Sequence, residues 1–206
     1  MSQTTQESVM RYDAEQKSKT RERVLKQAAR AIRVEGPHCV SVAAVMSSAG
    51  LTHGGFYAHF DSKDALIAAA IEQMFAESWE HWLAETKRVP PAEGLASFID
   101  LYLSTRHRDA AGRGCPMAAL AADIPRLTSA SRRAFAAGVG RLTASMKALL
   151  EQLGIEDAES MAASVLSEML RALSLARAEP HRASADALLG ASRQALKRRL
   201  GLPLQH

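Results

Sequence analysis

The stretch Gly50–Phe60, GLTHGGFYAHF, combines a turn, two adjacent glycines, and aromatic residues that alternate with a histidine. Helix-forming sequence lies on both sides of it. Each glycine costs a helix about 1 kcal/mol relative to alanine, so Gly54 and Gly55 must serve something other than helix stability. A helix whose first turn carries almost no side chain can bring its backbone close to another molecule. Near its end, Tyr57 and His59 are suited to hydrogen bonds with phosphate oxygens.

The residues before this stretch predict a helix-turn-helix. Ser41 is an N-cap candidate for a short helix that continues to Ser48. The turn that follows needs a residue able to adopt positive φ, and Gly50 supplies it. A further helix then begins with Thr52 as its cap. In this arrangement the second helix enters the major groove of DNA by its N-terminal residues.

The side chains expected to contact DNA lie at both ends of this second helix. Thr52 can offer a hydroxyl to a base edge or a phosphate, and His53 can donate to a guanine or a phosphate. Lys63, at the start of the next helix, is a further phosphate candidate. The alternative is that Tyr57 and His59 do not contact DNA and are ordinary residues at the edge of a core. The candidate DNA-binding residues are Ser41, Thr52, His53, Gly54, Gly55, Tyr57, His59 and Lys63.

The distribution of charge agrees with a nucleic-acid partner for the N-terminal part. Residues 1–63 carry nine Lys and Arg against six acidic residues, whereas residues 64–206 carry 17 against 16. The first third of the chain therefore holds most of the positive excess, as expected where a protein meets an anion such as DNA. A solvated basic face would give the same balance.

Over residues 20–66 the sequence resembles the TetR/AcrR family of bacterial one-component transcriptional regulators. The resemblance rests on the run VSVAAVMSSAGLTHGGFYAHFDSKDALI, which contains the pattern G-L-T-x-G-x-F-Y-x-H-F-x-S-K-x-x-L. It implies an N-terminal DNA-binding domain and a C-terminal domain that binds a ligand and dimerises. Such a regulator would be a dimeric repressor that binds a palindromic operator in double-stranded DNA. Gly55 departs from the pattern, because many relatives carry a larger residue there, such as threonine.

Helical periodicity extends over almost the whole chain, and strand signals are absent, so the expected fold is all-α with about nine helices. We expect a flexible arm over residues 1–14, the helix-turn-helix domain over 15–63, and the ligand-binding and dimerisation domain over 64–206. The fourth helix, capped by Asp61 or Ser62, should join the two domains. The later helices are expected near 92–107, 115–123, 126–153, 157–178 and 184–200.

A second stretch that contains a potentially reactive residue is HRDAAGRGCPMAALAADIPR, residues 107–126. Pro116 suits the first turn of a helix, which places Cys115 at or beside the N-cap. The positive helix end and the nearby Arg113 would favour the thiolate, and the flanking glycines would leave the sulfur accessible. The stretch is similar to a G-C-P-x-A-A-L segment in a subset of these regulators, among whose cousins NemR-type repressors sense electrophiles through cysteine. The alternative is that Cys115 is a small buried residue that fills a helix junction.

The C-terminal helices also carry candidates for a ligand cavity and a dimer interface. His81, His107 and Asp100 offer polar groups to orient a hydrophobic or aromatic inducer. The last two helices carry apolar faces, and the resemblance to the TetR/AcrR family implies that they form a homodimer through a four-helix interface, with an intramolecular bundle as the alternative. The candidate ligand-binding or sensor residues are Cys115, Phe75, Trp79, Trp82, Phe98, Tyr102, His107, Met117 and Phe135.

Other classes of protein are less favoured. An enzyme would need a nucleophile with its base, paired carboxylates or a metal cluster, and only Cys115 with His107 forms a conceivable dyad. A non-specific structural DNA-binding protein would need neither a cavity nor an operator. No run of apolar residues approaches a membrane span, and the polar N-terminus lacks a signal core. With two isolated cysteines, these features favour a cytoplasmic protein that uses no cofactor and no metal.

Overall fold

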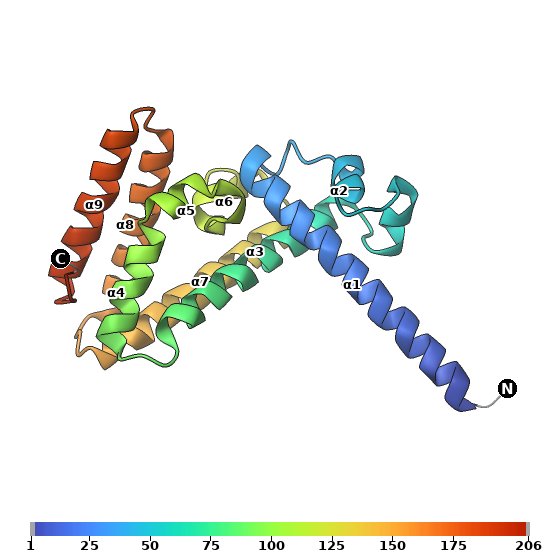
Figure 1. Cartoon of the computed structure of the whole chain (residues 1–206), viewed down its shortest axis with the longest axis horizontal. Helices are drawn as coiled ribbons and strands as arrows, with labels where there is room; N and C mark the ends of the chain where they lie inside the picture. The colour runs from blue at the N-terminus through green and yellow to red at the C-terminus, as the bar shows by residue number, and fades with distance from the viewer. Residues whose placement is uncertain (1–2, 205–206) are drawn as a thin grey trace.

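The computed structural model describes the backbone of residues 3–204 and the side chains of residues 15–204, and all the regular secondary structure in this part of the chain is helical. It contains nine α-helices and three short 3-10 helices, which confirms the predicted all-α class (Figure 1). The elements are α1 (Gln3–Glu35), α2 (Val42–Ser48), η1 (His53–Ala58), α3 (Lys63–Thr86), α4 (Pro91–Tyr102), α5 (Thr105–Asp109), η2 (Ala111–Arg113), α6 (Pro116–Leu120), η3 (Ile124–Arg126), α7 (Ser129–Gln152), α8 (Ala158–Ala178) and α9 (Arg182–Arg199).

The N-terminal domain is built from the second half of α1, from α2 and from η1. The Ser41 side chain accepts a hydrogen bond from the Ala44 amide, so the predicted cap is present. Gly50 has a φ of 71°, as the turn requires. Residues 3–14 continue α1 as helix where the sequence suggested a flexible arm. The protruding N-terminal end of α1 is clear in Figure 1.

The third helix of this domain differs from the expectation. Residues 53–58 form a 3-10 helix rather than an α-helix, and Thr52 makes no side-chain capping bond. A 3-10 turn is common where only a few residues lie between two caps. The following helix α3 begins with a working cap, because the Ser62 hydroxyl accepts from the Ala65 amide at 3.0 Å. The prediction that Asp61 or Ser62 caps this helix is therefore settled in favour of Ser62.

Helices α3 and α7 are the two long helices that run side by side through the centre of the molecule (Figure 1). They approach closely at Gly138, where an added Cβ would collide with the Phe75 ring. Only glycine allows that ring to lie against the α7 backbone. The core is continuous from α1 through α3 to α8, and its largest fully buried side chains include Ile32, Ile71 and Met146.

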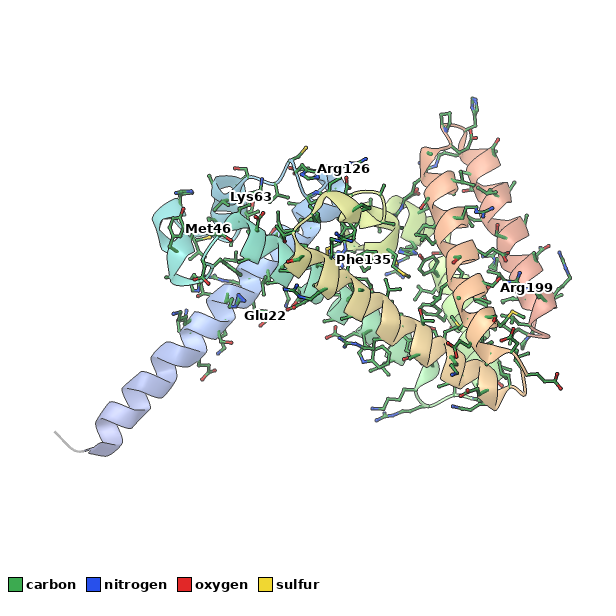
Figure 2. The ribbon with its side chains drawn as sticks, turned by 180° about the vertical axis from the view of Figure 1, so that it is seen from behind. Glu22, Met46, Lys63, Arg126, Phe135 and Arg199 are labelled. Atoms are coloured by element: carbon green, nitrogen blue, oxygen red, sulfur yellow. The ribbon has the colours of Figure 1, made fainter. Side chains whose placement is uncertain are left out.

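Helices α8 and α9 form an antiparallel hairpin at the end of the molecule opposite to α2 and η1 (Figure 1). Figure 2 shows the same separation, with Met46 and Lys63 at one end and Arg199 at the other. A buried ion pair joins α9 to α4, with Lys197 Nζ 2.5 Å from Asp100 Oδ2. Asp100 thus belongs to this pair and not to the ligand cavity where the sequence suggested it.

The expected helix near 92–107 is divided in the structure. It ends at Tyr102, and Ser104 caps the separate helix α5 by accepting from the His107 amide at 3.0 Å. Serine competes with helix continuation through its own hydroxyl, which explains the break. None of the helices in the described part of the chain is both long enough and apolar enough to cross a membrane.

Candidate DNA-binding surface and ligand pocket

The helix-turn-helix presents the predicted residues to solvent on one side and anchors itself on the other. Thr52, His53 and Gly54 are exposed, and Tyr57 exposes 72% of its surface. On the opposite side Phe56 is buried and stacks on Phe60 with ring centroids 5.7 Å apart. These two buried rings anchor η1 on the core of the N-terminal domain.

Neither glycine of the pair is required by the fold of the chain itself. Gly54 and Gly55 both have negative φ, which any residue can adopt. A Cβ at Gly54 would meet nothing within 4 Å, and one at Gly55 would make an ordinary contact of 3.8 Å with Met46. The missing side chains therefore leave an open surface at the start of η1, as the approach to another molecule requires.

The side chains of His59 and Lys63 are less available to DNA than the sequence suggested, because one is partly buried and the other is hydrogen-bonded within the protein. Burial lowers the pKa of His59 from its ordinary value, and the charges of Lys17 and Arg21 lower it further. Its Nδ1 atom is buried without a hydrogen-bond partner in the described part of the chain. Lys63 is half-buried and donates from Nζ to the His38 carbonyl at 3.2 Å. Both side chains remain at the domain edge beside the exposed end of η1.

A cavity of about 340 Å³ lies in the C-terminal domain between α3, α4, α5, α6, α7 and α8. Six of the nine residues proposed from the sequence line it: Trp82, Phe98, Tyr102, His107, Cys115 and Met117. Leu142 and Leu166 complete its apolar wall. This volume falls in the range of small-molecule sites, which are concave and largely apolar.

The other three proposed residues lie elsewhere. Phe75 and Phe135 pack on each other in an edge-to-face arrangement with centroids 5.5 Å apart. They belong to the α3–α7 contact, and Figure 2 shows Phe135 on α7 toward the DNA-binding end. Trp79 lies under the Arg141 guanidinium, 5.9 Å from the ring centroid, and does not line the cavity. Helical spacing correctly placed all three residues on apolar helix faces. It could not distinguish a residue that packs in the core from one that lines the cavity.

Cys115 is buried, with 6% of its surface exposed, and the exposed thiol of the chain is Cys39. The prediction of an accessible sulfur on a mobile loop is wrong on this point. The preceding Gly114 is packed against the Arg177 guanidinium, which occupies the place that a Cβ would take. A side chain at this position would therefore require the guanidinium to leave its hydrogen bonds with the His107 and Arg108 carbonyl oxygens. Cys115 is the N-cap residue of α6, as predicted, although its side chain makes no capping bond.

His107 is held by both ring nitrogens, so it is not free to orient a ligand. Its Nδ1 lies 2.7 Å from the Tyr102 carbonyl oxygen, and its Nε2 accepts from the Cys115 amide at 3.2 Å. The two bonds require the tautomer with the proton on Nδ1. Burial lowers the pKa of His107, and the charge of Arg177 acts in the same direction, which favours the neutral ring. Nε2 therefore faces the Cys115 backbone amide rather than serving the thiol as a base.

The wall of the cavity is linked to the DNA-binding domain through Arg33. This α1 side chain is buried and donates from Nε to the Gly114 carbonyl at 2.9 Å. It also donates to the Met74 carbonyl at 3.4 Å and forms an ion pair of 2.7 Å with Glu77. Arg33 is one of the nine basic residues counted over residues 1–63, and the sequence did not distinguish it from the others. No periodic signal marks a basic residue that turns inward.

These features define a class of protein, namely an all-helical protein with a helix-turn-helix at one end and a small-molecule-sized cavity in the other domain. Comparison with known proteins identifies the family that the N-terminal part resembles. Residues 24–70 match the family model described as "Bacterial regulatory proteins, tetR family". Residues 24–70 therefore carry the N-terminal domain of the TetR family. No curated protein sequence matches it.

Solved structures extend the likeness of fold over nearly the whole chain. A TetR transcriptional regulator from Chloroflexus aurantiacus is 23% identical with a TM-score of 0.78, and the match covers 91% of this chain and 96% of that one. A TetR-family regulator from Agrobacterium tumefaciens is 24% identical, with a TM-score of 0.75 and coverage of 88% and 98%. The reduced form of NemR from Escherichia coli is 19% identical, with a TM-score of 0.75 and coverage of 87% and 96%.

Proposed function

We propose that the protein is a dimeric repressor that binds a palindromic DNA operator and is released by a small inducer in the cavity. The observation that carries the proposal is the bonding of Arg33, which ties α1 of the DNA-binding domain to Gly114 in the cavity wall. A ligand that shifts this wall changes the position of α1 and α3 together. A regulator of this kind acts in the cytoplasm, where its DNA lies.

The dimer would form through the outer faces of α8 and α9. On α8 the solvent-facing residues include Ala163, Ser167, Ser174 and Leu175, and Leu175 exposes 50% of its surface. On α9 small residues recur every four positions at Ala183, Ala187, Ala191 and Ala195, all exposed in the single chain. Small side chains allow two helix pairs to approach closely. Leu196 and Ala162 face the core of the chain and would not take part.

Two such subunits would place their η1 segments at successive major grooves. The spacing needed is about 34 Å for half-sites one helical turn apart. An inducer that prefers a different spacing lowers DNA affinity by linkage, because it binds only the state that fits DNA poorly. The expected partners are therefore double-stranded operator DNA, a second copy of the chain, and a small hydrophobic or electrophilic molecule.

Footprinting of the promoter beside the protein's own gene, with and without candidate compounds, tests this proposal. The expected result is a protected palindrome whose protection is lost with an inducer. Protection that spreads without sequence preference would support a structural DNA-binding protein instead. Turnover of a small electrophile by the purified protein would support an enzyme that uses Cys115.

One observation favours a version of this proposal in which the inducer reacts covalently with a cysteine. Cys115 lines the cavity, so an electrophile small enough to enter would meet the thiol there. Alkylation would then add volume to the wall that Arg33 holds at Gly114. The variant Cys115→Ser should keep its DNA in the presence of such an electrophile, whereas wild type should release it. Equal release by both proteins would assign induction to non-covalent binding.

A further inference from the structure

The cavity has an apolar wall on one part of its lining and positive charge on another. Its aromatic and aliphatic wall is formed by Trp82, Phe98, Leu142 and Leu166. Two arginines, Arg106 and Arg113, line the same cavity from α5 and η2. Both are exposed, and neither forms a salt bridge with any residue in the described part of the chain. An apolar body and a negative group would each find a partner here.

The carboxylates of the protein do not fully neutralise this positive charge. Glu85 is the one acidic residue that lines the cavity, so it can offset only one of the two arginines. Arg177 stands directly behind the wall and donates to the carbonyl oxygens of His107 and Arg108. Among the described residues it has no carboxylate partner, and burial lowers its pKa. The charge around the cavity is therefore positive and is left for a ligand to balance.

A buried donor without an oxygen or nitrogen acceptor points in the same direction. Tyr102 lines the cavity with 7% of its surface exposed, and among the described residues its hydroxyl has only the Cys115 thiol beside it. Burial raises the pKa of this phenol well above its ordinary value, and the nearby Cys115 raises it further. The group is thus a permanent donor, and the Cys115 sulfur is only a weak acceptor for it. A ligand oxygen would satisfy it.

We infer that the cavity binds an aromatic organic anion, such as a ring carboxylate. Its ring would pack on Trp82 and Phe98, its charge would be balanced by Arg106 and Arg113, and an oxygen would accept from Tyr102. Arginine presents a planar pair of donors that matches a carboxylate. The inference rests on the proposed function, since it names the class of inducer for the same cavity.

Calorimetric titration of the full-length protein with a matched series tests the charge of the ligand. The probes are 2-naphthoate, its neutral amide, and the corresponding naphthylmethylammonium ion, which share one ring system. The carboxylate should bind at least about tenfold more tightly than the amide, and the ammonium ion should not bind. Raising the salt concentration should weaken the carboxylate alone, because the two arginines are exposed.

Variants then assign the residues. The double change Arg106→Gln and Arg113→Gln should lower carboxylate affinity to the level of the amide and leave the affinity for the amide unchanged. The matched control is Arg132→Gln with Arg133→Gln, two exposed arginines on α7 that do not line the cavity. Tyr102→Phe keeps the ring and removes the hydroxyl, so it should weaken binding of both the carboxylate and the amide.

The outcomes separate this inference from the proposed function. Equal binding of carboxylate and amide, or no binding of the carboxylate, overturns the assignment of an anion. If the amide binds as tightly as the carboxylate and also releases operator DNA, the proposed response to a ligand stands. Only the assignment of the ligand as an anion is then wrong. If the carboxylate binds with the expected dependence on Arg106 and Arg113 but DNA stays bound, the anion site stands and the proposed induction fails.

Discussion

The Nε of Arg33 donates to the carbonyl oxygen of Gly114 at 2.9 Å and so joins two residues 81 positions apart in the chain. One of them belongs to the first helix of the DNA-binding domain, and the other directly precedes Cys115 in the cavity wall. The Arg33 side chain is only 3% exposed, and its ion pair with Glu77 extends the link to α3. A single buried side chain thus connects three parts of the molecule.

Arg33→Lys should weaken the coupling between ligand and DNA. A lysine can keep the ion pair with Glu77, but it lacks the second donor that reaches Gly114. We expect the variant to bind both ligand and DNA, with a smaller ratio between the DNA affinities measured without and with inducer. Loss of the buried hydrogen bond should also cost about 1–3 kcal/mol of stability, measured by urea denaturation. Arg30→Lys, an exposed neighbour on α1, is the control. An unchanged affinity ratio in Arg33→Lys would refute the coupling.

Gly54→Ala should separate stability from DNA binding. The position has negative φ and open space around it, so alanine fits the free protein. Removing a glycine restricts the unfolded chain and should raise the free energy of unfolding by about 0.4–1 kcal/mol. The added methyl group would hold η1 away from the bases and lower operator affinity, measured by fluorescence anisotropy. Operator affinity equal to wild type would mean that η1 does not approach DNA at this residue.

Lys63→Ala and Tyr57→Phe should weaken binding to every DNA sequence. Lys63 supplies a charge, so its removal should reduce the slope of log affinity against log salt by about 1. Tyr57 supplies an exposed hydroxyl, so Tyr57→Phe should reduce affinity with a smaller change in slope. Because Lys63 also bonds to the His38 carbonyl, thermal unfolding must confirm that the variant is folded. If operator affinity at moderate salt is unaltered in both variants, the docking is different.

Leu175→Glu should dissociate the dimer without unfolding the chain. The residue lies on the outer face of α8 with half of its surface exposed, so the single subunit tolerates the charge. In a dimer the charge would be buried without a partner, at a cost of several kcal/mol. Sedimentation velocity should then show monomers that no longer bind the operator. Val89→Glu, an apolar residue of similar exposure between α3 and α4, serves as the control. Dimers of wild-type mass in Leu175→Glu would move the interface elsewhere.

The two cysteines should differ in reactivity in the order set by their burial. A bulky maleimide should modify Cys39 faster than Cys115, because the first is exposed and the second is buried. A small quinone that enters the cavity should reduce this difference. Mass spectrometry of Cys39→Ser and Cys115→Ser, each with a single thiol, gives the two rates. A Cys115 that reacts with the bulky reagent as fast as Cys39 would show that the cavity opens widely in solution.

Local sequence signals predicted most of the fold. The caps Ser41 and Ser62 and the turn at Gly50 lie where the structure has them, because capping and positive φ depend on neighbouring residues only. The predicted helix near 92–107 was too long, because the capping hydroxyl of Ser104, which ends α4 and begins α5, was not recognised among the helical spacing of its neighbours. The class and order of the elements were thus readable from short windows of sequence.

The cavity was only partly predictable. Helical spacing identifies the apolar face of a helix, but it does not reveal which neighbour covers each residue. Trp82 and Phe75 look equivalent in the sequence, yet one lines the cavity and the other packs against Gly138. The burial of Cys115 and the inward turn of Arg33 likewise depend on contacts between segments far apart in the chain. Arg106 was missed as a lining residue for the same reason.

The packing of Phe75 against Gly138 determines how α3 can move. Because the ring occupies the space over a glycine, sliding α3 along α7 would drive it into the next side chain of that helix. Rotation about the contact needs no such collision, so we expect Phe75 to be the pivot of any rotation of α3 against α7. At 1.5 Å per residue, Lys63 lies about 18 Å from it and Trp82 about 10 Å on the other side. A ligand that displaces Trp82 would therefore displace Lys63 in the opposite direction and by almost twice as much.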